Sequence, residues 1–423
     1  MLTLKMLRDD PEFVVKKLAI KNFDAADIVK DVLALDAERR NCQTESDALL
    51  SVQKQKAAEI GSLMKQGRRE EAEAAKAEVA SVKARSSALL SRGEEAARAL
   101  EAKLVLLPNL PCDLVAPGKG SDDNEVVKMG GPEVQLPEGA LPHWELCKKY
   151  DIIDFDLGVK ITGAGFPVYK GKGAKLQRAL INFFLDCNTA DGYKEVEPPV
   201  MVNQASGFGT GQLPDKEGQM YHATADDFYM VPTAEVPVTN IFRDVILQQD
   251  ELPQALTAYT PCFRREAGSY GKDVRGLNRL HQFDKVEIVR VEKPEDSYAA
   301  LDRMVAHVES IVNKLGLRYR ILRLCGGDMS FTSAITYDFE LWSAAQGRWL
   351  EISSVSNFES FQANRLHLRY RDENGKIQLA HTLNGSSLAL PRVVAALLED
   401  NQTPEGIVIP EVLRPYTGFD KID

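Results

Sequence analysis

The sequence predicts an α+β protein with an N-terminal antiparallel coiled-coil hairpin arm and a larger domain, an antiparallel β-sheet flanked by helices. Residues 25–106 contain no proline and are rich in alanine, glutamate, lysine, arginine and leucine, as long helices are. Apolar residues recur there in steps of three, four and seven. From about residue 131, short alternating strands mix with helices, without the regular strand–helix alternation of a parallel sheet.

The arm is expected to consist of two helices packed along one seam. The segment MKQGRREEAE separates them, and Gly67 can turn the chain there. Each helix would have about 35–40 residues and a length of roughly 50–60 Å. The spacing alone also fits a helix pair used only for dimerisation. The seam positions are Ile28, Leu35, Cys42, Leu49 and Leu63 in the first helix, and Ala72, Ala75, Val79, Val82, Ser86, Leu89, Gly93, Ala96 and Leu100 in the second.

A linker is expected after the arm. The segment LLPNLPCDLVAPGKGSDDNE combines prolines, glycines and acidic residues, as connecting segments do. We therefore expect the arm in residues 1–107, the linker in residues 108–130 and the second domain in residues 131–423. In that domain, AKLQRALINFFLDCNTA and PEDSYAALDRMVAHVESIVNKLG are typical of helices, while LTAYTPCFRRE and RLHQFDKVEIVRV alternate like strands.

Composition narrows the class of protein. The 423 residues carry a net charge of −10, so any contact with nucleic acid has to be local. None of the six cysteines forms a CxxC pair, and we therefore expect no zinc site. The chain starts MLTLKMLRDDPEF, which has charges where a signal peptide needs an apolar run, and no stretch reaches the ~20 apolar residues of a membrane span. These features predict a cytoplasmic protein without a membrane partner.

The segment FRREAGSYGKDVRGLNRLHQF gathers positive charge between two expected strands. If the strands are regular, Arg264 shares a face with Glu266, and Phe283 shares one with Glu287 about 13 Å away. Such a face offers a guanidinium for phosphate, an aromatic ring for a nucleobase and carboxylates for an amine. A solvated surface hairpin with exposed ion pairs fits the same spacing.

A resemblance favours the first of these readings. The segment resembles motif 2 of class II aminoacyl-tRNA synthetases. Together with VPTAEVPVTN, HQFDKVEIV, EISSVSNFESFQANR and HTLNGSSLALPR, it closely resembles the seryl-tRNA synthetase family of the bacterial kind. The first hundred residues resemble that family's helical arm, and LPNLPC resembles its linker. The resemblance spans essentially the whole chain and places motif 1 at about residues 178–202, motif 2 at about 257–290 and motif 3 at about 382–402.

The resemblance implies a two-step ligase reaction. L-serine and ATP form seryl-adenylate and pyrophosphate, and serine then passes to the 3′ end of tRNA(Ser), with tRNA(Sec) as a further candidate. Charge develops on phosphoryl oxygens, so positioned cations and Mg²⁺ are expected to dominate catalysis. No protein nucleophile is required. The loop over residues 267–278 is expected to be mobile, because ATP has to enter and adenylate has to leave.

The resemblance also assigns roles to residues of the ATP site. Arg264 would hold the α-phosphate and the serine carboxylate, Glu266 would recognise adenine, and Phe283 would stack on it. Arg392 would hold the γ-phosphate, and Pro391 places it in the first turn of a helix, where phosphate is favoured. Glu351 and Ser354 would bind Mg²⁺, which requires a bulge or a strand end between them. The full ATP set is Arg264, Arg265, Glu266, Phe283, Glu351, Ile352, Ser353, Ser354 and Arg392, of which Arg264 and Arg392 are the catalytic pair.

The same resemblance implies a small polar pocket for serine. Carboxylates suit the ammonium group, while hydroxyl and amide groups suit the side-chain hydroxyl and disfavour alanine, which would leave them unpaired. The expected residues are Thr233, Ala234, Glu235, Arg264, Arg279, Glu287, Asn384 and Ser386.

The resemblance further implies a homodimer through motif 1, where Pro198 and Pro199 mark a strand end or edge. The arm would grip tRNA by its backbone and shape. Four residues depart from the family pattern beside the expected site and leave individual contacts open: Ile335, Val355, Phe358 and Pro391.

Three other classes of protein remain to be weighed. A relative that activates an amino acid for a carrier protein would lack the arm. A non-enzymatic coiled-coil adaptor would have no reason to keep the expected ATP and serine residues. Another class II synthetase, such as the threonine or proline enzyme, would not usually carry this N-terminal hairpin.

Overall fold

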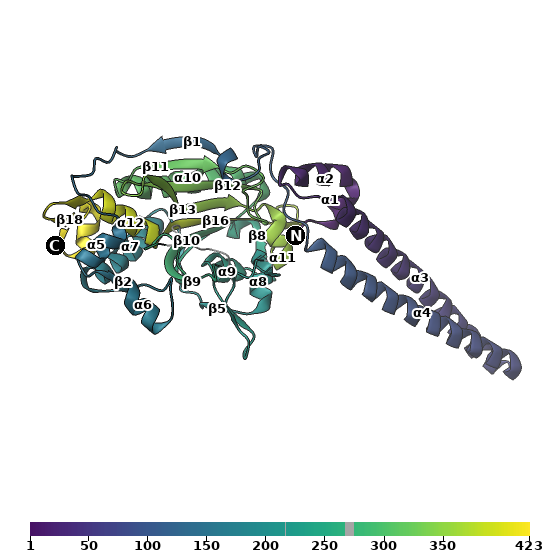
Figure 1. The fold of residues 1–423 in the computed structure, drawn as a ribbon. Helices are drawn as coiled ribbons and strands as arrows, with labels where there is room; N and C mark the ends of the chain where they lie inside the picture. The colour runs from purple at the N-terminus through teal and green to yellow at the C-terminus, as the bar shows by residue number, and fades with distance from the viewer. Residues whose placement is uncertain (216, 267–274) are drawn as a thin grey trace. The chain divides into compact units, whose positions relative to one another are not determined.

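A computed structural model describes residues 1–215, 217–266 and 275–423 of the chain (Figure 1). The chain divides into two compact units, which are described separately. The first comprises Met1–Ala19 and Phe23–Pro108, and the second comprises Ile20–Asn22 and Asn109–Asp423. The predicted α+β class is confirmed. None of the helices in the described part of the chain is long and apolar enough to cross a membrane.

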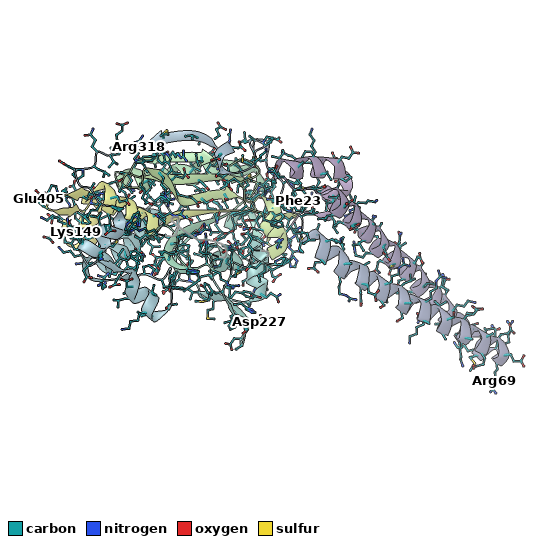
Figure 2. The ribbon with its side chains drawn as sticks, viewed as in Figure 1. Phe23, Arg69, Lys149, Asp227, Arg318 and Glu405 are labelled. Atoms are coloured by element: carbon teal, nitrogen blue, oxygen red, sulfur yellow. The ribbon has the colours of Figure 1, made fainter. Side chains whose placement is uncertain are left out.

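The first unit contains the expected hairpin. Helix α3 (Ala26–Lys65) and helix α4 (Arg69–Leu104) run antiparallel, preceded by the short helices α1 (Leu4–Asp9) and α2 (Pro11–Ile20). Gly67 makes the turn with a left-handed φ of +72°, which glycine adopts without strain. Figure 2 marks Arg69 beside this turn, at the start of α4.

Every predicted seam position of the hairpin is buried or half-buried. Midway along the pair, the Ser46 and Ser86 hydroxyls hydrogen-bond at 3.0 Å. The helices pack tightly at Gly93, since a Cβ there would lie 3.4 Å from the Cβ of Cys42. The seam also contains Asp36, which is fully buried and which the apolar pattern could not identify. Arg39 and Arg40 each approach its carboxylate to 3.0 Å and neutralise it.

The second unit is built on one eight-stranded sheet. The strand order is β1-β11-β12-β13-β16-β10-β9-β4, and all neighbours are antiparallel except β4 and β9. Pro198 and Pro199 follow the edge strand β4, as expected of residues that cannot donate to a ladder. The strands are β1 (Glu125–Gly130), β4 (Lys194–Glu195), β9 (Gln254–Phe263), β10 (Gln282–Glu292), β11 (Tyr319–Arg323), β12 (Ile335–Ser343), β13 (Arg348–Asn357) and β16 (His381–Ala389).

Helices cover both faces of this sheet. Helices α7 (Gly171–Ala190), α10 (Ser297–Lys314) and α12 (Leu390–Asp400) pack on one face and enclose the main core, in which Phe184, Ile288 and Phe339 are fully buried. The two predicted helical segments correspond to α7 and α10. On the other face, α9 (Glu235–Asn240) and α11 (Ser360–Leu366) enclose a smaller core with α8 (Gln204–Thr210) beside them.

The remaining elements form small sheets and connections around this centre. These remaining elements are α5 (His143–Lys149), α6 (Phe155–Ile161), α13 (Arg414–Thr417), β2 (Ile153–Asp154), β3 (Val168–Tyr169), β5 (Met201–Val202), β6 (His222–Ala223), β7 (Phe228–Met230), β8 (Ile246–Gln248), β14 (Arg369–Arg371), β15 (Ile377–Leu379), β17 (Gln402–Thr403), β18 (Gly406–Val408) and β19 (Lys421–Ile422).

Lys21 belongs to the second unit and inserts its ammonium group among backbone carbonyls. It donates to Ser330 O at 2.7 Å and to Ser333 O at 3.0 Å.

Candidate active site

Strands β9 and β10 form the predicted hairpin and bring Arg264 against Phe283. Phe283 pairs with Cys262 across the ladder, and the Arg264 N–H donates to His281 O at 2.9 Å just beyond the end of β9. The Arg264 guanidinium carbon lies 5.3 Å from the centre of the Phe283 ring, a cation–π distance. Its Nε donates to Pro232 O at 3.3 Å. The guanidinium and the aromatic ring therefore form one surface, as a phosphate and a base of the same ligand require.

One premise of the sequence prediction is wrong at this point. Strand β9 ends at Phe263, so Arg264 and Glu266 are not alternate residues of a regular strand. Glu266 instead has a left-handed φ of +47°, which is uncommon for a residue with a side chain. Its carboxylate forms an ion pair with Arg279. Residues 267–274, most of the loop expected to be mobile, lie outside the described residues.

Arg392 lies in the first turn of α12, directly after Pro391, as predicted. Its Nε donates to Asn278 O at 2.9 Å and its Nη1 donates to Glu351 O at 2.7 Å. Burial lowers the pKa of Arg392. The Glu351 charge opposes this shift, and the positive charges of Arg264 and Arg279 add to it. Arg264 and Arg279 therefore both lie within electrostatic range of Arg392, an arrangement suited to a polyphosphate.

Strand β13 contains the expected bulge between Glu351 and Ser354. In the pairing with β12, Phe339 faces Ser353 but Glu340 faces Glu351, so Ile352 is the extra residue. The bulge restores Glu351 and Ser354 to one face of the sheet, where Asp338 joins them. Burial and the Glu351 charge raise the pKa of Asp338, and a hydrogen bond from Ser354 partly offsets the shift.

Glu287 is the centre of the predicted serine pocket. It is almost fully buried, and Lys285 Nζ lies 2.5 Å from its Oε2. Lys285 also donates to the Thr233 hydroxyl at 2.8 Å, and that hydroxyl donates to Glu287 Oε2 at 3.3 Å. Asn384 Nδ2 reaches Glu287 Oε1 at 3.3 Å. Ser386 pairs directly with Glu287 across the β10–β16 ladder, which brings these predicted pocket residues together.

Glu235 supplies a second carboxylate to this pocket. Burial and, after it, the nearby Glu287 charge raise its pKa to about 7, and a hydrogen bond from Gln362 opposes the shift. That bond, from Gln362 Nε2 to Glu235 Oε1, is 2.6 Å long. Gln362 is fixed in turn by the Thr382 hydroxyl, which donates to its Oε1 at 2.7 Å. Ala234 is fully buried at the start of α9 and orients Glu235 through the backbone.

Three residues of the predicted ATP set contact the site differently from the others. Ile352 packs its side chain into the main core, so only its backbone faces the site strand. The Ser353 hydroxyl donates to Ser386 O at 2.5 Å and links β13 to β16. Arg265 has an exposed side chain, and its backbone N–H binds Gln219 O at 2.8 Å.

Three further residues contact the predicted site residues and were not identified from the sequence, namely Lys285, Asp338 and Gln362. Lys285 could have been found, because it stands two residues before Glu287 on an alternating strand and therefore shares its face. Asp338 could have been found only with the pairing of β12 and β13. Gln362 comes from α11, far along the chain, and no local pattern distinguishes it from a surface glutamine.

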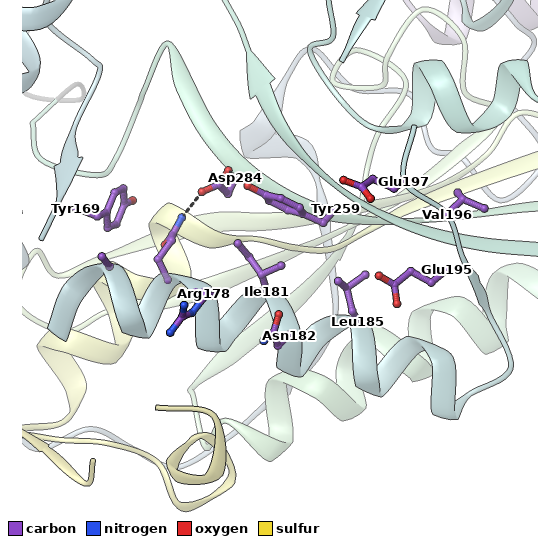
Figure 3. A pocket seen from close by; sticks show the side chains of 12 residues that line it. Tyr169, Arg178, Ile181, Asn182, Leu185, Glu195, Val196, Glu197, Tyr259 and Asp284 are labelled. Carbon is purple, nitrogen blue, oxygen red and sulfur yellow. Dashed lines mark hydrogen bonds between the residues drawn. The ribbon is translucent and has the colours of Figure 1, made fainter. Parts of the chain in front are cut away.

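A separate cavity of about 580 Å³ lies on the α7 side of the sheet (Figure 3). Asp284, the neighbour of Phe283 in β10, accepts hydrogen bonds there from Gln177 and from the Tyr259 hydroxyl, both at 2.9 Å. The predicted ATP and serine residues do not line this cavity. Most of its lining comes instead from the predicted motif 1, with Arg178, Ile181, Asn182, Leu185, Glu195, Val196 and Glu197.

The antiparallel sheet, the three converging arginines and the buried carboxylate pocket define a class II aminoacyl-tRNA synthetase. Residues 220–401 match the tRNA synthetase class II core domain (G, H, P, S and T). Residues 1–111 match the seryl-tRNA synthetase N-terminal domain.

Full-length relatives narrow the class further. The chain is 51% identical to a serine–tRNA ligase of Salinibacter ruber, over 100% of this chain and 99% of the relative. It is 47% identical to one of Akkermansia muciniphila, with the same coverage. The crystal structure of seryl-tRNA synthetase from Pyrococcus horikoshii complexed with ATP superposes with a TM-score of 0.94, at 32% identity over 100% of this chain and 99% of that one.

The chain belongs to the seryl-tRNA synthetase family, and it is an ATP-dependent serine–tRNA ligase. The matched N-terminal domain and the full-length identity exclude the carrier-protein ligase, the adaptor and the other class II synthetases. Prolyl-tRNA synthetase of Giardia lamblia, for comparison, reaches a TM-score of 0.56 over 64% of this chain.

Proposed function

We propose that seryl-adenylate forms on the sheet surface between Arg264 and Glu287, with the nucleotide at the arginine end and serine at the carboxylate end. The observation that carries this proposal is the division of charge along one surface. The positive charges of Arg264 and Arg279 both act on Arg392 at one end. Glu235 and Glu287 are buried together at the other.

The chemistry follows from that division. A serine carboxylate oxygen attacks the α-phosphorus of ATP and forms a new P–O bond, while the bond to the bridging oxygen breaks and pyrophosphate leaves with its electrons. Negative charge on the phosphoryl oxygens grows in the transition state, where Arg264 is positioned to oppose it. Arg392 would hold the γ-phosphate, and Phe283 and Glu266 would hold adenine. Alignment of the two substrates supplies much of the remaining acceleration.

Serine would be selected by the buried polar cluster. Its ammonium group adds a positive charge next to Glu235 and Glu287, which suits a pocket with two carboxylates and one lysine, Lys285. Thr233, Asn384 and Ser386 offer partners to the side-chain hydroxyl. Alanine would leave these groups unpaired, at about 1–3 kcal/mol for each buried group.

A magnesium ion would bind at the bulge of β13. Asp338 Oδ1 is buried there without a hydrogen-bond partner among the described residues, next to Glu351 and Ser354. Two carboxylates, a hydroxyl and the phosphates of ATP form the hard oxygen set that Mg²⁺ prefers. Bound there, the ion would neutralise phosphate charge. Arg392 is held against the same strand by Glu351 O and would orient the departing pyrophosphate.

The proposal also covers the domain division of the chain, its partners and its location in the cell. The proposed division is an arm in residues 1–107, a linker in 108–130 and a catalytic domain in 131–423. The arm would bind tRNA(Ser), with tRNA(Sec) as a second candidate. Two copies would join through motif 1 at the edge strand β4 and helix α7, whose shared cavity a partner subunit would cover. The proposed location is the cytoplasm.

Exchange of pyrophosphate into ATP, measured with each of the twenty amino acids, tests the site. Only serine is expected to support rapid exchange. Arg264→Ala and Glu287→Ala are each expected to reduce it by at least about a thousandfold, because one removes transition-state charge stabilisation and the other leaves Lys285 unpaired in the pocket. Arg414→Ala in α13, which is none of the predicted ATP or serine residues and donates to Ile409 O, serves as the matched control. Rapid exchange by either site variant would refute these roles.

A further inference from the structure

A closed circuit of hydrogen bonds holds residues 276–278, which precede strand β10. It begins at His143 in α5 and Glu399 in α12, both with fully buried side chains. Glu399 Oε1 accepts from the His143 backbone N–H at 3.0 Å and from His143 Nδ1 at 2.8 Å. Glu399 Oε2 accepts from the Ser343 hydroxyl at 2.5 Å. The carboxylate is thus fully occupied in its ionised form.

The far side of the His143 ring holds the backbone of motif 2. Nε2 of His143 accepts a hydrogen bond from the Leu277 N–H at 2.9 Å. Because Nδ1 donates to Glu399 and Nε2 accepts, the bonding pattern assigns a neutral ring with its proton on Nδ1. Gly276 lies against the Nε2 edge of the ring with φ +65°, and a Cβ there would lie 2.3 Å from Nε2, so only glycine fits.

The circuit closes through Asn278, the next residue. Its Nδ2 donates to Gln346 Oε1 at 2.9 Å, and Gln346 Nε2 donates to the Ser343 hydroxyl at 2.8 Å. Ser343 leads back to Glu399. The Asn278 carbonyl, held on both sides by this circuit, is the acceptor for Arg392 Nε. The guanidinium is therefore aimed by a backbone oxygen whose position depends on His143.

The pKa of Glu399 indicates that this hydrogen-bond circuit is rigid. Burial alone would raise the pKa of its carboxyl group, but the hydrogen bonds from His143 and Ser343 outweigh burial and hold the pKa below its ordinary value. A buried carboxylate kept ionised by its partners is expensive to leave unpaired, so the circuit is rigid.

We infer that His143 and Glu399 are positioning residues for ATP, which fix residues 276–278 and, through the Asn278 carbonyl, orient Arg392 toward the terminal phosphate. The inference rests on the proposed role of Arg392. Neither residue touches substrate. Their effect is confined to the nucleotide end of the site, because the contacts given above do not reach Glu235 or Glu287.

The test is a double-mutant cycle between His143 and Arg392, read by pyrophosphate exchange and normalised to the folded fraction. His143→Asn can keep a donor for Glu399 but loses the acceptor for Leu277. It is expected to raise KM for ATP about tenfold and to leave KM for serine within about twofold. In the Arg392→Ala background the same change is expected to have no further effect, because its route of action is gone.

The test includes a second variant of the circuit and a control variant outside it. Gln346→Ala opens the circuit from a half-buried turn, where folding is not at risk, and is expected to raise KM for ATP about two- to threefold. His307→Asn is the matched control. His307 is also buried and hydrogen-bonded, to Asn188 at 2.8 Å, but it lies in α10 outside the circuit. It is expected to change thermal stability without changing KM for ATP.

The possible failures are distinguishable. If His143→Asn lowers activity by the same factor with and without Arg392, or raises KM for serine as much as KM for ATP, the inference is wrong and the proposed function stands. If Arg392→Ala alone leaves KM for ATP unchanged, the proposed role of Arg392 is wrong and the inference falls with it.

Discussion

Glu235 is the residue of the site whose charge depends most directly on pH near neutrality. Its pKa is raised to about 7 by burial and by the Glu287 charge, with Lys285 and Arg264 opposing the shift. In a folded chain without serine, the carboxyl group is therefore mostly protonated below pH 7 and mostly ionised above it. The unfolded chain has its ordinary pKa near 4.5, so ionising Glu235 costs stability as pH rises from about 4.5 to 7.

Serine binding reverses the preference of Glu235. An ammonium group beside the carboxyl favours the ionised form, so below pH 7 binding requires release of a proton. KM for serine is expected to rise about five- to sixfold as pH falls from 7 to 6, because the ionised fraction of a group with a pKa of about 7 falls from about one half to about one tenth. KM for ATP is expected to change little over that interval. Glu235→Gln should abolish the dependence, and a retained dependence in that variant would assign the titration to another group.

At the scale of elements, the α3–α4 hairpin and the catalytic sheet are expected to serve separate steps. Adjacent seam residues Ser46 and Ser86 allow the hairpin to be shortened without disturbing its base, by replacing residues 47–85 with a short glycine-rich turn. Exchange with serine should stay within about twofold of the full chain, because no site residue is removed. Transfer to tRNA(Ser) should fall about a hundredfold, the effect of losing several contacts of ~1 kcal/mol each.

The measurement compares pyrophosphate exchange with aminoacylation of tRNA(Ser) in the same preparation. Equal losses in the two reactions would contradict a division of labour between arm and sheet. Unchanged aminoacylation would mean that the hairpin serves another purpose, such as the dimerisation that its seam alone also fits.

Elements with a strong local period could be predicted from the sequence, and long-range pairing could not. Apolar residues of the hairpin seam recur in steps of four and seven, and those of strands β9 and β10 recur in steps of two. The bulge at Ile352 was required by the assigned roles of Glu351 and Ser354, and the pairing with β12 confirms it. Asp338 and Gln362 reach the site only through tertiary packing, which no spacing in one segment encodes. The end of β9 before Arg264 was missed because alternation continues in the sequence beyond the last ladder pair.

At the scale of the whole molecule, the proposed dimer has a direct test. The cavity between α7 and β4 is lined by the half-buried Ile181 and Leu185, and by the carboxylates of Glu195 and Glu197. A partner covering this face would bury both apolar side chains. Leu185→Glu is expected to weaken association, since a charge would have to be buried at the interface.

Sedimentation at micromolar concentration checks this prediction. The unmodified protein should sediment as a species of about 94 kDa, twice the 46.9 kDa of one chain, and Leu185→Glu should approach the mass of one chain. Leu90→Glu, an exposed leucine on the arm, is the control and should remain a dimer. A monomeric unmodified protein would exclude the motif 1 interface.

The hydrogen bonds of Lys21 have a consequence for the order in which the chain can fold during synthesis. Lys21 precedes its acceptor residue Ser330 by 309 positions in the chain. At about 5–20 residues per second, roughly 15–60 s pass on the ribosome before the two can meet. The second unit therefore depends on a residue that lies before the arm in the sequence. A fragment that begins after the arm would lack Lys21 and its hydrogen bonds to the Ser330 and Ser333 carbonyls.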